Sequence, residues 1–140
     1  MQLTKILLPV DGSAEADRAA EYALGLAGLT EAQILLVHCH RQFPALLGEP
    51  YFQNAVSRIL SQSNELLEPY RKRLASKGAT FEDRVLEGPP GNAICEVART
   101  EGCDLIVMGS RGRSDLEGLI LGSVAHRVLH AAPCPVLVIR

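Results

Sequence analysis

The sequence has no tryptophan, and aromatic residues make up only 4% of its 140 residues. An excess of one charge is also missing, because 14 Lys and Arg are balanced by 16 Asp and Glu, for a formal net charge of -2. Proteins that bind nucleic acid need a basic surface, and those that hold single strands add aromatic side chains on which bases stack. Nucleic acid is therefore not an expected partner.

Long hydrophobic runs are absent as well. Apolar runs such as Ile6 to Val10 are far shorter than the ~20 residues that a membrane span requires. The segment Met1 to Lys5 lacks the pattern of a signal peptide. We therefore expect a cytoplasmic protein that does not enter a membrane.

Cysteine is sparse and scattered. The four cysteines never form a Cys-x-x-Cys pair, so neither a zinc knuckle nor a thioredoxin-type redox site is indicated. In a reducing compartment such residues are interpreted as small buried hydrophobic side chains. They are Cys39, Cys95, Cys103 and Cys134.

The chain does contain enough apolar material for one ordinary domain. Hydrophobic residues make up 47% of it and charged residues 21%. A domain of about this length buries roughly 68–70% of the surface that its unfolded chain exposes, so no metal or disulfide is needed for folding. With no internal repeat or linker in sight, we expect residues 1–140 to form a single domain.

Short apolar runs alternate with stretches of helical periodicity. The runs are continuous rather than alternating, which is typical of a parallel sheet covered on both faces. The order of elements favours an α/β fold, a doubly wound open five-stranded parallel sheet of order 3-2-1-4-5 with helices on both faces. The expected strands are 5–10, 34–38, 81–86, 105–108 and 136–139.

Three features of the expected helices and loops stand out. Ser13 is predicted to cap the first helix. Pro69 lies inside the second, from about 56 to 78, and is predicted to kink or split it because proline removes a backbone donor. The apolar loop Arg41 to Gln53 before that helix is equally consistent with covering a ligand, meeting a partner or packing on its own domain.

A ligand of such a sheet binds beyond the carboxyl ends of the strands, where the strand order reverses. For the expected order, that point lies between the first and fourth strands. Their ends carry Pro9-Val10-Asp11-Gly12 and Met108-Gly109-Ser110-Arg111-Gly112. These two segments are therefore expected to meet at one crevice.

Glycines in and after the second segment have a spacing suited to phosphate. Gly109, Gly112 and Gly122 offer backbone N–H groups with no side chain in the way. Ser123 follows at the start of an expected helix, whose first N–H groups and dipole favour an anion. Each glycine alone is consistent with a simple turn, but the combination indicates a polyphosphate ligand.

The sequence resembles the universal stress protein family over essentially its whole length. Gly109, Gly112, Gly122 and Ser123 match the motif G-x2-G-x9-G-[ST] of the ATP-binding branch of that family. The other stretches that carry the resemblance are 6–13, 104–112, 122–124 and 133–138.

The resemblance implies a role for each matching position. Asp11 and Gly109 would lie near the ribose, with Pro9 and Val10 beside the nucleoside. Cys39 falls where family members often place a valine against the adenine. The phosphates would be held by Gly112, Gly122, Ser123 and Val124, and would carry Mg²⁺ or Mn²⁺ as part of the ligand rather than in a metal site built by the protein.

Other charged and titratable residues near the crevice leave alternatives open. Arg111 and Arg113 either contact the phosphates or are solvated loop residues, and Arg113 is included among the candidate binding residues. The pairs His38/His40 and His126/His130 have spacings that can hold a metal, but no third ligand is evident and no metal site is expected.

The resulting hypothesis is an ATP-binding stress-response protein in which bound nucleotide changes a surface that partner proteins recognise. One alternative is slow ATP hydrolysis or phosphotransfer in which Asp11 places metal or water, although no catalytic base is identified. Another is a dimeric scaffold that needs no nucleotide. The last strand is an apolar edge, so a homodimer is expected to form through Val136, Leu137, Val138 and Ile139, as family members commonly form dimers.

Overall fold

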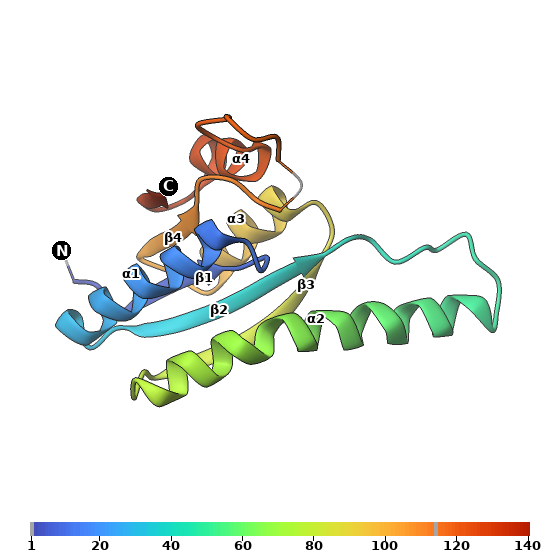
Figure 1. The fold of residues 1–140 in the computed structure, drawn as a ribbon, viewed down its shortest axis with the longest axis horizontal. Helices are drawn as coiled ribbons and strands as arrows, with labels where there is room; N and C mark the ends of the chain where they lie inside the picture. Colours follow the sequence, from blue (N-terminus) through green and yellow to red (C-terminus); the bar gives the residue numbers. More distant parts are fainter. Residues whose placement is uncertain (1, 114) are drawn as a thin grey trace.

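The computed structural model describes residues 2–113 and 115–140, where strands and helices alternate along the chain (Figure 1). The strands are β1 (Lys5–Pro9), β2 (Gln33–His40), β3 (Phe81–Glu87), β4 (Leu105–Gly109) and β5 (Val136–Ile139). The helices are α1 (Ala14–Thr30), α2 (Tyr51–Ser76), α3 (Pro90–Thr100) and α4 (Ser123–Ala131).

All strand pairs in the sheet are parallel, and the spatial order is β3-β2-β1-β4-β5. The predicted fold is thereby confirmed. Pro9 at the end of β1 pairs with Val37 of β2, and Gly109 at the end of β4 pairs with Ile139 of β5. The order reverses between β1 and β4, so the carboxyl ends of these two strands form the predicted switch point.

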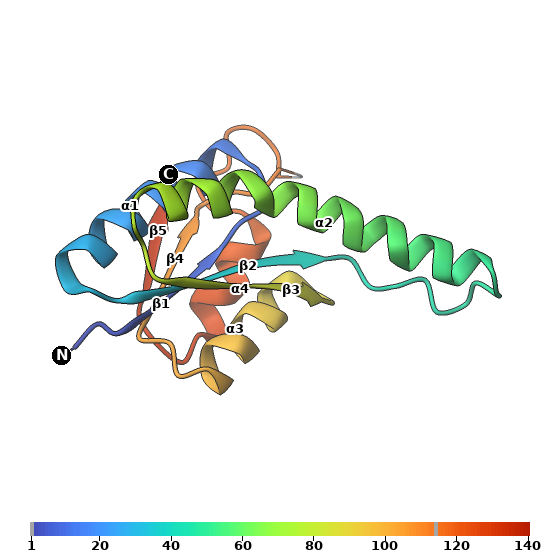
Figure 2. The ribbon, with the colours of Figure 1, turned by 90° about the horizontal axis from the view of Figure 1, so that it is seen from below.

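Helices cover both faces of the sheet, with α1 and α2 on one side and α3 and α4 on the other (Figure 2). Ile6 and Leu8 of β1 pack toward α1 and α2, whereas Leu7 packs toward α3 and α4. All three side chains are fully buried, and each such burial contributes about 1.5–3 kcal/mol. α1 approaches the sheet closely because alanines line its inner face, namely Ala16, Ala19, Ala20 and Ala23.

The turn between β1 and α1 places the first part of the crevice. Gly12 has φ +83°, a conformation that side chains disfavour, and it turns the chain directly after Asp11. The hydroxyl of Ser13 then accepts a hydrogen bond from the Ala16 N–H at 3.1 Å, which confirms the predicted N-cap.

α2 runs without interruption through Pro69, so the predicted split is wrong. Leu67, Tyr70 and Leu74 are buried on either side of the proline and hold both parts of the helix against the sheet. The proline removes one backbone donor, and the packing of these three side chains outweighs that loss.

The N-terminal part of α2 and the loop before it extend beyond the end of the sheet (Figures 1 and 2). The helix begins at Tyr51, earlier than predicted, and thereby includes the end of the loop Arg41 to Gln53. Phe43 packs its ring against His40 at 4.7 Å, but Leu46, Leu47 and Tyr51 are exposed. No helix among the described residues is long and apolar enough to cross a lipid bilayer.

Candidate functional site

A cavity of about 240 Å³ lies at the carboxyl edge of the sheet, between the ends of β1, β2 and β4 and the helices α3 and α4. Of the predicted binding residues, Gly122 and Ser123 are the two that do not line it. Those that do are Pro9, Val10, Asp11, Cys39, Gly109, Gly112, Arg113 and Val124. The structure thus brings residues from opposite ends of the chain to one crevice.

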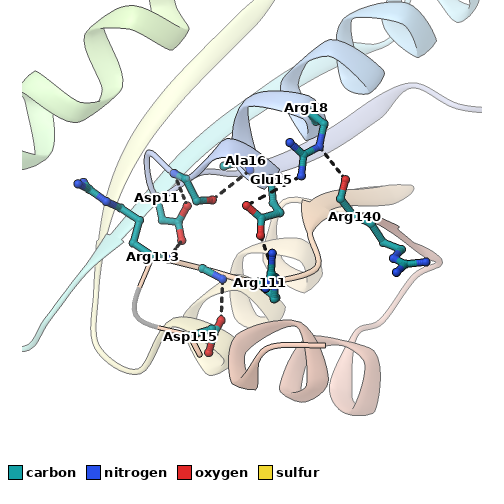
Figure 3. A network of polar contacts seen from close by, with 10 residues as sticks. Asp11, Glu15, Ala16, Arg18, Arg111, Arg113, Asp115 and Arg140 are labelled. Atoms are coloured by element: carbon teal, nitrogen blue, oxygen red, sulfur yellow. Dashed lines mark hydrogen bonds and ion pairs between the residues drawn. The ribbon is translucent and has the colours of Figure 1, made fainter. Parts of the chain in front are cut away.

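Asp11 connects the two segments that meet there (Figure 3). Its Oδ1 accepts a hydrogen bond from the Ser13 N–H at 3.0 Å, and its Oδ2 accepts one from the Arg113 N–H at 3.1 Å. The carboxylate therefore ties the turn after β1 to the loop after β4. Each carboxylate oxygen keeps an accepting lone pair for a further donor.

Cys39 forms part of the wall at the end of β2. Its thiol donates to the carbonyl of Gly88 at 3.3 Å. Burial, with the carboxylate of Glu87 as a smaller cause, raises the pKa of Cys39 to about 11. The residue is therefore a neutral thiol at physiological pH and behaves as a small apolar wall residue rather than a nucleophile.

Gly109 has a packing role that its place in the sequence does not reveal. A Cβ on Gly109 would lie 2.7 Å from the Cβ of Glu15 and 3.1 Å from the backbone N of Ala16. The 2.7 Å contact is closer than real Cβ atoms approach and the 3.1 Å contact is tight, so glycine is needed here for α1 to approach β4 this closely. Gly109 also borders the cavity, where the absence of a side chain leaves the backbone accessible.

Gly112 and Gly122 are enclosed by carboxylates. A Cβ on Gly112 would lie 2.6 Å from Oδ2 of Asp11, and a Cβ on Gly122 would lie 2.1 Å from Oδ2 of Asp115. The Gly112 N–H donates to the same Asp115 oxygen at 2.6 Å (Figure 3). Asp115 was not among the predicted binding residues, and neither were Pro90, Ile94 and Ala125, which also line the cavity. The sequence signal of Asp115 is its position between two motif glycines.

The N-terminus of α4 adds backbone donors. Gly122 is the N-cap and has no side-chain capping bond. The first N–H to bond back along the helix is that of His126, which donates to the carbonyl of Gly122 at 3.0 Å. The N–H groups of the first turn, including those of Ser123 and Val124, therefore lack intrahelical acceptors and suit an anion.

The two arginines of the loop have different surroundings. Arg111 donates from Nε to Oε2 of Glu15 at 3.0 Å, and that glutamate is 9% exposed. Arg113 lies over Gly12 and lines the cavity, and in the part of the chain that the structure describes its guanidinium has no ion pair. Arg113 is therefore the arginine available to a ligand, whereas Arg111 is held by α1.

The histidines near the crevice contact backbone carbonyls. Nδ1 of His38 lies 2.9 Å from the carbonyl oxygen of Val10, and Nδ1 of His40 lies 2.6 Å from that of Arg41. Across residues 2–113 and 115–140, no three His, Cys, Asp or Glu side chains are grouped to hold a metal ion.

Known proteins match this chain along nearly its whole length. The family model described as the universal stress protein family matches residues 2–140. A universal stress protein of Thermus aquaticus is 41% identical over 136 residues, which cover 96% of this chain and 97% of that protein. The solved structure of MJ0577 from Methanocaldococcus jannaschii superimposes with a TM-score of 0.89 at 28% identity, covering 99% of this chain and 96% of that one.

Several solved proteins of the same fold carry adenine nucleotides. One is a universal stress protein in complex with cAMP, which is 24% identical, has a TM-score of 0.76 and covers 100% of this chain and 99% of that one. Another, from Arabidopsis thaliana, has AMP bound and is 23% identical with a TM-score of 0.71, covering 97% of this chain and 90% of that one.

Proposed function

The chain belongs to the universal stress protein family, and from this membership we propose that it binds ATP and acts as a nucleotide-dependent regulatory or stress-resistance module. One observation carries the proposal. The ends of β1 and β4 and the N-terminus of α4 meet at one crevice, where a side chain at any motif glycine would collide with neighbouring atoms.

The nucleoside half of the ligand fits the wall formed by the ends of β1 and β2. Pro9, Val10 and the neutral thiol of Cys39 offer an apolar surface for the adenine. Asp11 lies between this wall and the phosphate end, and its free lone pairs accept from ribose hydroxyl groups. The relatives solved with cAMP and AMP support the choice of an adenine nucleotide.

The phosphate half fits the other end of the crevice. The backbone N–H groups of Gly112 and of the first turn of α4 are the donors there, and Arg113 adds a positive charge. Ser123 supplies a hydroxyl at the first position of α4. A chain of several phosphates spans this row of donors better than a single phosphate does, which favours ATP over AMP.

A divalent ion is expected to accompany the phosphates. Mg²⁺ prefers oxygen ligands and is commonly held by one or two carboxylates together with substrate phosphates. The carboxylate of Asp11 beside Gly112 fits that requirement. When bound, Mg²⁺ or Mn²⁺ would neutralise phosphate charge beside this group.

We also propose that two copies pair through β5. This strand lies at the end of the sheet and pairs with β4 on one side. Val136, Leu137 and Val138 are half-buried within one copy, and pairing with a second β5 would cover the remaining edge. A cytoplasmic location also stays a prediction.

The experiment is to purify the protein, denature it and identify any released nucleotide by chromatography. ATP titration by calorimetry then compares the protein with Gly122→Val, in which the new side chain collides with Asp115 and with the backbone of Arg111. Gly28→Val is the control, because no atom lies within 4 Å of its added Cβ. The proposal fails if no nucleotide is released and ATP titration gives no heat.

A further inference from the structure

The phosphate end of the crevice already contains an anion that belongs to the chain itself. Oδ2 of Asp115 accepts the hydrogen bond of the Gly112 N–H at 2.6 Å (Figure 3). The same oxygen lies against Gly122 at the N-terminus of α4. A carboxylate therefore accepts from the donor, and lies beside the helix end, that we propose for phosphate oxygens.

Asp115 and a phosphate cannot occupy this place together. The Gly112 N–H is a single donor, and a phosphate oxygen within its reach would stand beside the Asp115 carboxylate, a like charge. Asp115 lines the cavity together with Gly112, so its side chain takes up space at the phosphate end.

Of the two carboxylates beside Gly112, Asp115 is the one held more weakly. Asp11 accepts from two backbone N–H groups, those of Ser13 and Arg113. For Asp115 the described part of the chain provides one such donor, Gly112 itself. When a phosphate takes that donor, Asp115 loses its anchor and Asp11 keeps both of its own.

The loop that carries Asp115 has little else to hold it in place. The Asp115 N–H donates to the carbonyl of Gly112 at 3.3 Å and the Leu119 N–H to that of Leu116 at 3.5 Å, both longer than the usual 2.9–3.0 Å. Leu116 is 75% exposed and Ile120 is 74% exposed, so neither anchors the loop in the core. Leu121 at the end of the loop packs against the core on the side of α3 and α4, so residues 115–120 are the part that can move without disturbing the packed layers.

We propose that Asp115 is a built-in competitor for the phosphates of the nucleotide, and that its displacement releases the loop bearing Leu116 and Ile120. The inference rests on the proposed nucleotide function. Asp115 would then discriminate between ATP and adenosine, because adenosine contacts only the nucleoside wall and leaves Asp115 in place. A divalent cation shared with the phosphates reduces the repulsion, so the effect of Asp115 is largest without metal.

The test measures ATP and adenosine binding by calorimetry, with EDTA and with Mg²⁺, for the unmodified protein and Asp115→Asn. Asparagine keeps the shape and the accepting oxygen but removes the charge. Glu117→Gln is the matched control, because it removes an exposed charge from the same loop. In EDTA we expect Asp115→Asn to bind ATP about tenfold more tightly or better, adenosine within about twofold, and Glu117→Gln to change neither.

A second measurement follows the loop directly. In ¹H–¹⁵N NMR spectra, ATP should shift the Gly112 amide and speed hydrogen exchange at residues 116–120, whereas adenosine should leave both unchanged. Unchanged or weaker ATP binding by Asp115→Asn, or an equal gain for adenosine, overturns the inference. If Asp115→Asn loses ATP binding only when Mg²⁺ is present, Asp115 is a metal ligand and the inference is also overturned. If neither ligand binds either protein, the proposed function fails and the inference with it.

Discussion

Gly109→Ala tests whether this glycine is required by packing rather than by the ligand. The added Cβ would lie 2.7 Å from the Glu15 Cβ, 3.0 Å from the Glu15 carbonyl carbon and 3.1 Å from the Ala16 N. Two of these three atoms are backbone, so α1 itself must move away from β4. Overpacking of this kind costs about 1–3 kcal/mol of the free energy of unfolding.

Gly25→Ala is the matched substitution, in the same helix that Gly109 contacts. Its added Cβ has no atom within 4 Å, and Gly25 lies inside α1. Alanine in a helix interior is more favourable than glycine by roughly 0.5–1 kcal/mol, so this variant should be slightly stabilised. The two alanine variants should therefore differ in unfolding free energy by about 1.5–4 kcal/mol, with opposite signs relative to the parent.

Urea denaturation followed by circular dichroism measures this difference without any nucleotide present. The midpoint for Gly109→Ala should fall and that for Gly25→Ala should rise, with similar m-values. If Gly109→Ala is as stable as the parent protein, the close approach of α1 to β4 is not a constraint and the packing explanation is refuted.

Three further predictions concern the edge strand, the arginines and Cys39. The Pro135 carbonyl accepts from Ile106 of β4 and the Ile139 carbonyl accepts from Ser110 directly after it, so the backbone of Val138 faces the free edge. Val138→Pro should give a monomer in light scattering, and a persistent dimer would contradict pairing through β5. Arg113→Gln should weaken ATP binding in calorimetry with unchanged stability. Arg111→Gln should lower the unfolding free energy by about 1–3 kcal/mol, because it removes the 3.0 Å partner of buried Glu15 and leaves only the 4.0 Å ion pair with Arg18. The opposite pattern in the two variants would refute the roles given to the two arginines. Because the pKa of Cys39 is raised to about 11, its neutral thiol stabilises the folded state at pH values below its unfolded pKa near 9, and this contribution is lost as the pH rises toward 11. At pH 8, alkylation of Cys39, localised by mass spectrometry, should be roughly a hundredfold slower in the folded than in the unfolded protein. Equal alkylation rates would contradict the burial of Cys39.

Much of the architecture follows from local sequence patterns. Continuous apolar runs such as Ile34 to Val37 predict strands buried on both faces, and the alternation with helices leaves few parallel topologies. The switch point, and with it the meeting of Asp11 and Gly112, follows from that topology alone. These predictions succeeded because burial and chain connectivity act on every residue of an element.

The remaining features depend on contacts that periodicity does not encode. Pro69 is tolerated because Leu67 and Tyr70 are buried beside it, and that burial is known only once α2 lies on the sheet. The contact of Asp115 with Gly112 depends on the conformation of one loop and one side chain. The packing role of Gly109 depends on how near α1 lies to β4.

The unequal lengths of α2 and its neighbouring strand leave part of the helix outside the packed layers. A helix of 26 residues is about 39 Å long, whereas the 8 residues of β2 span about 26 Å. The helix therefore overhangs the sheet by roughly 13 Å, a length that no strand supports. Exposed residues of this overhang can be substituted at little cost to the core, so a new recognition surface could be engineered there while the crevice stays the same.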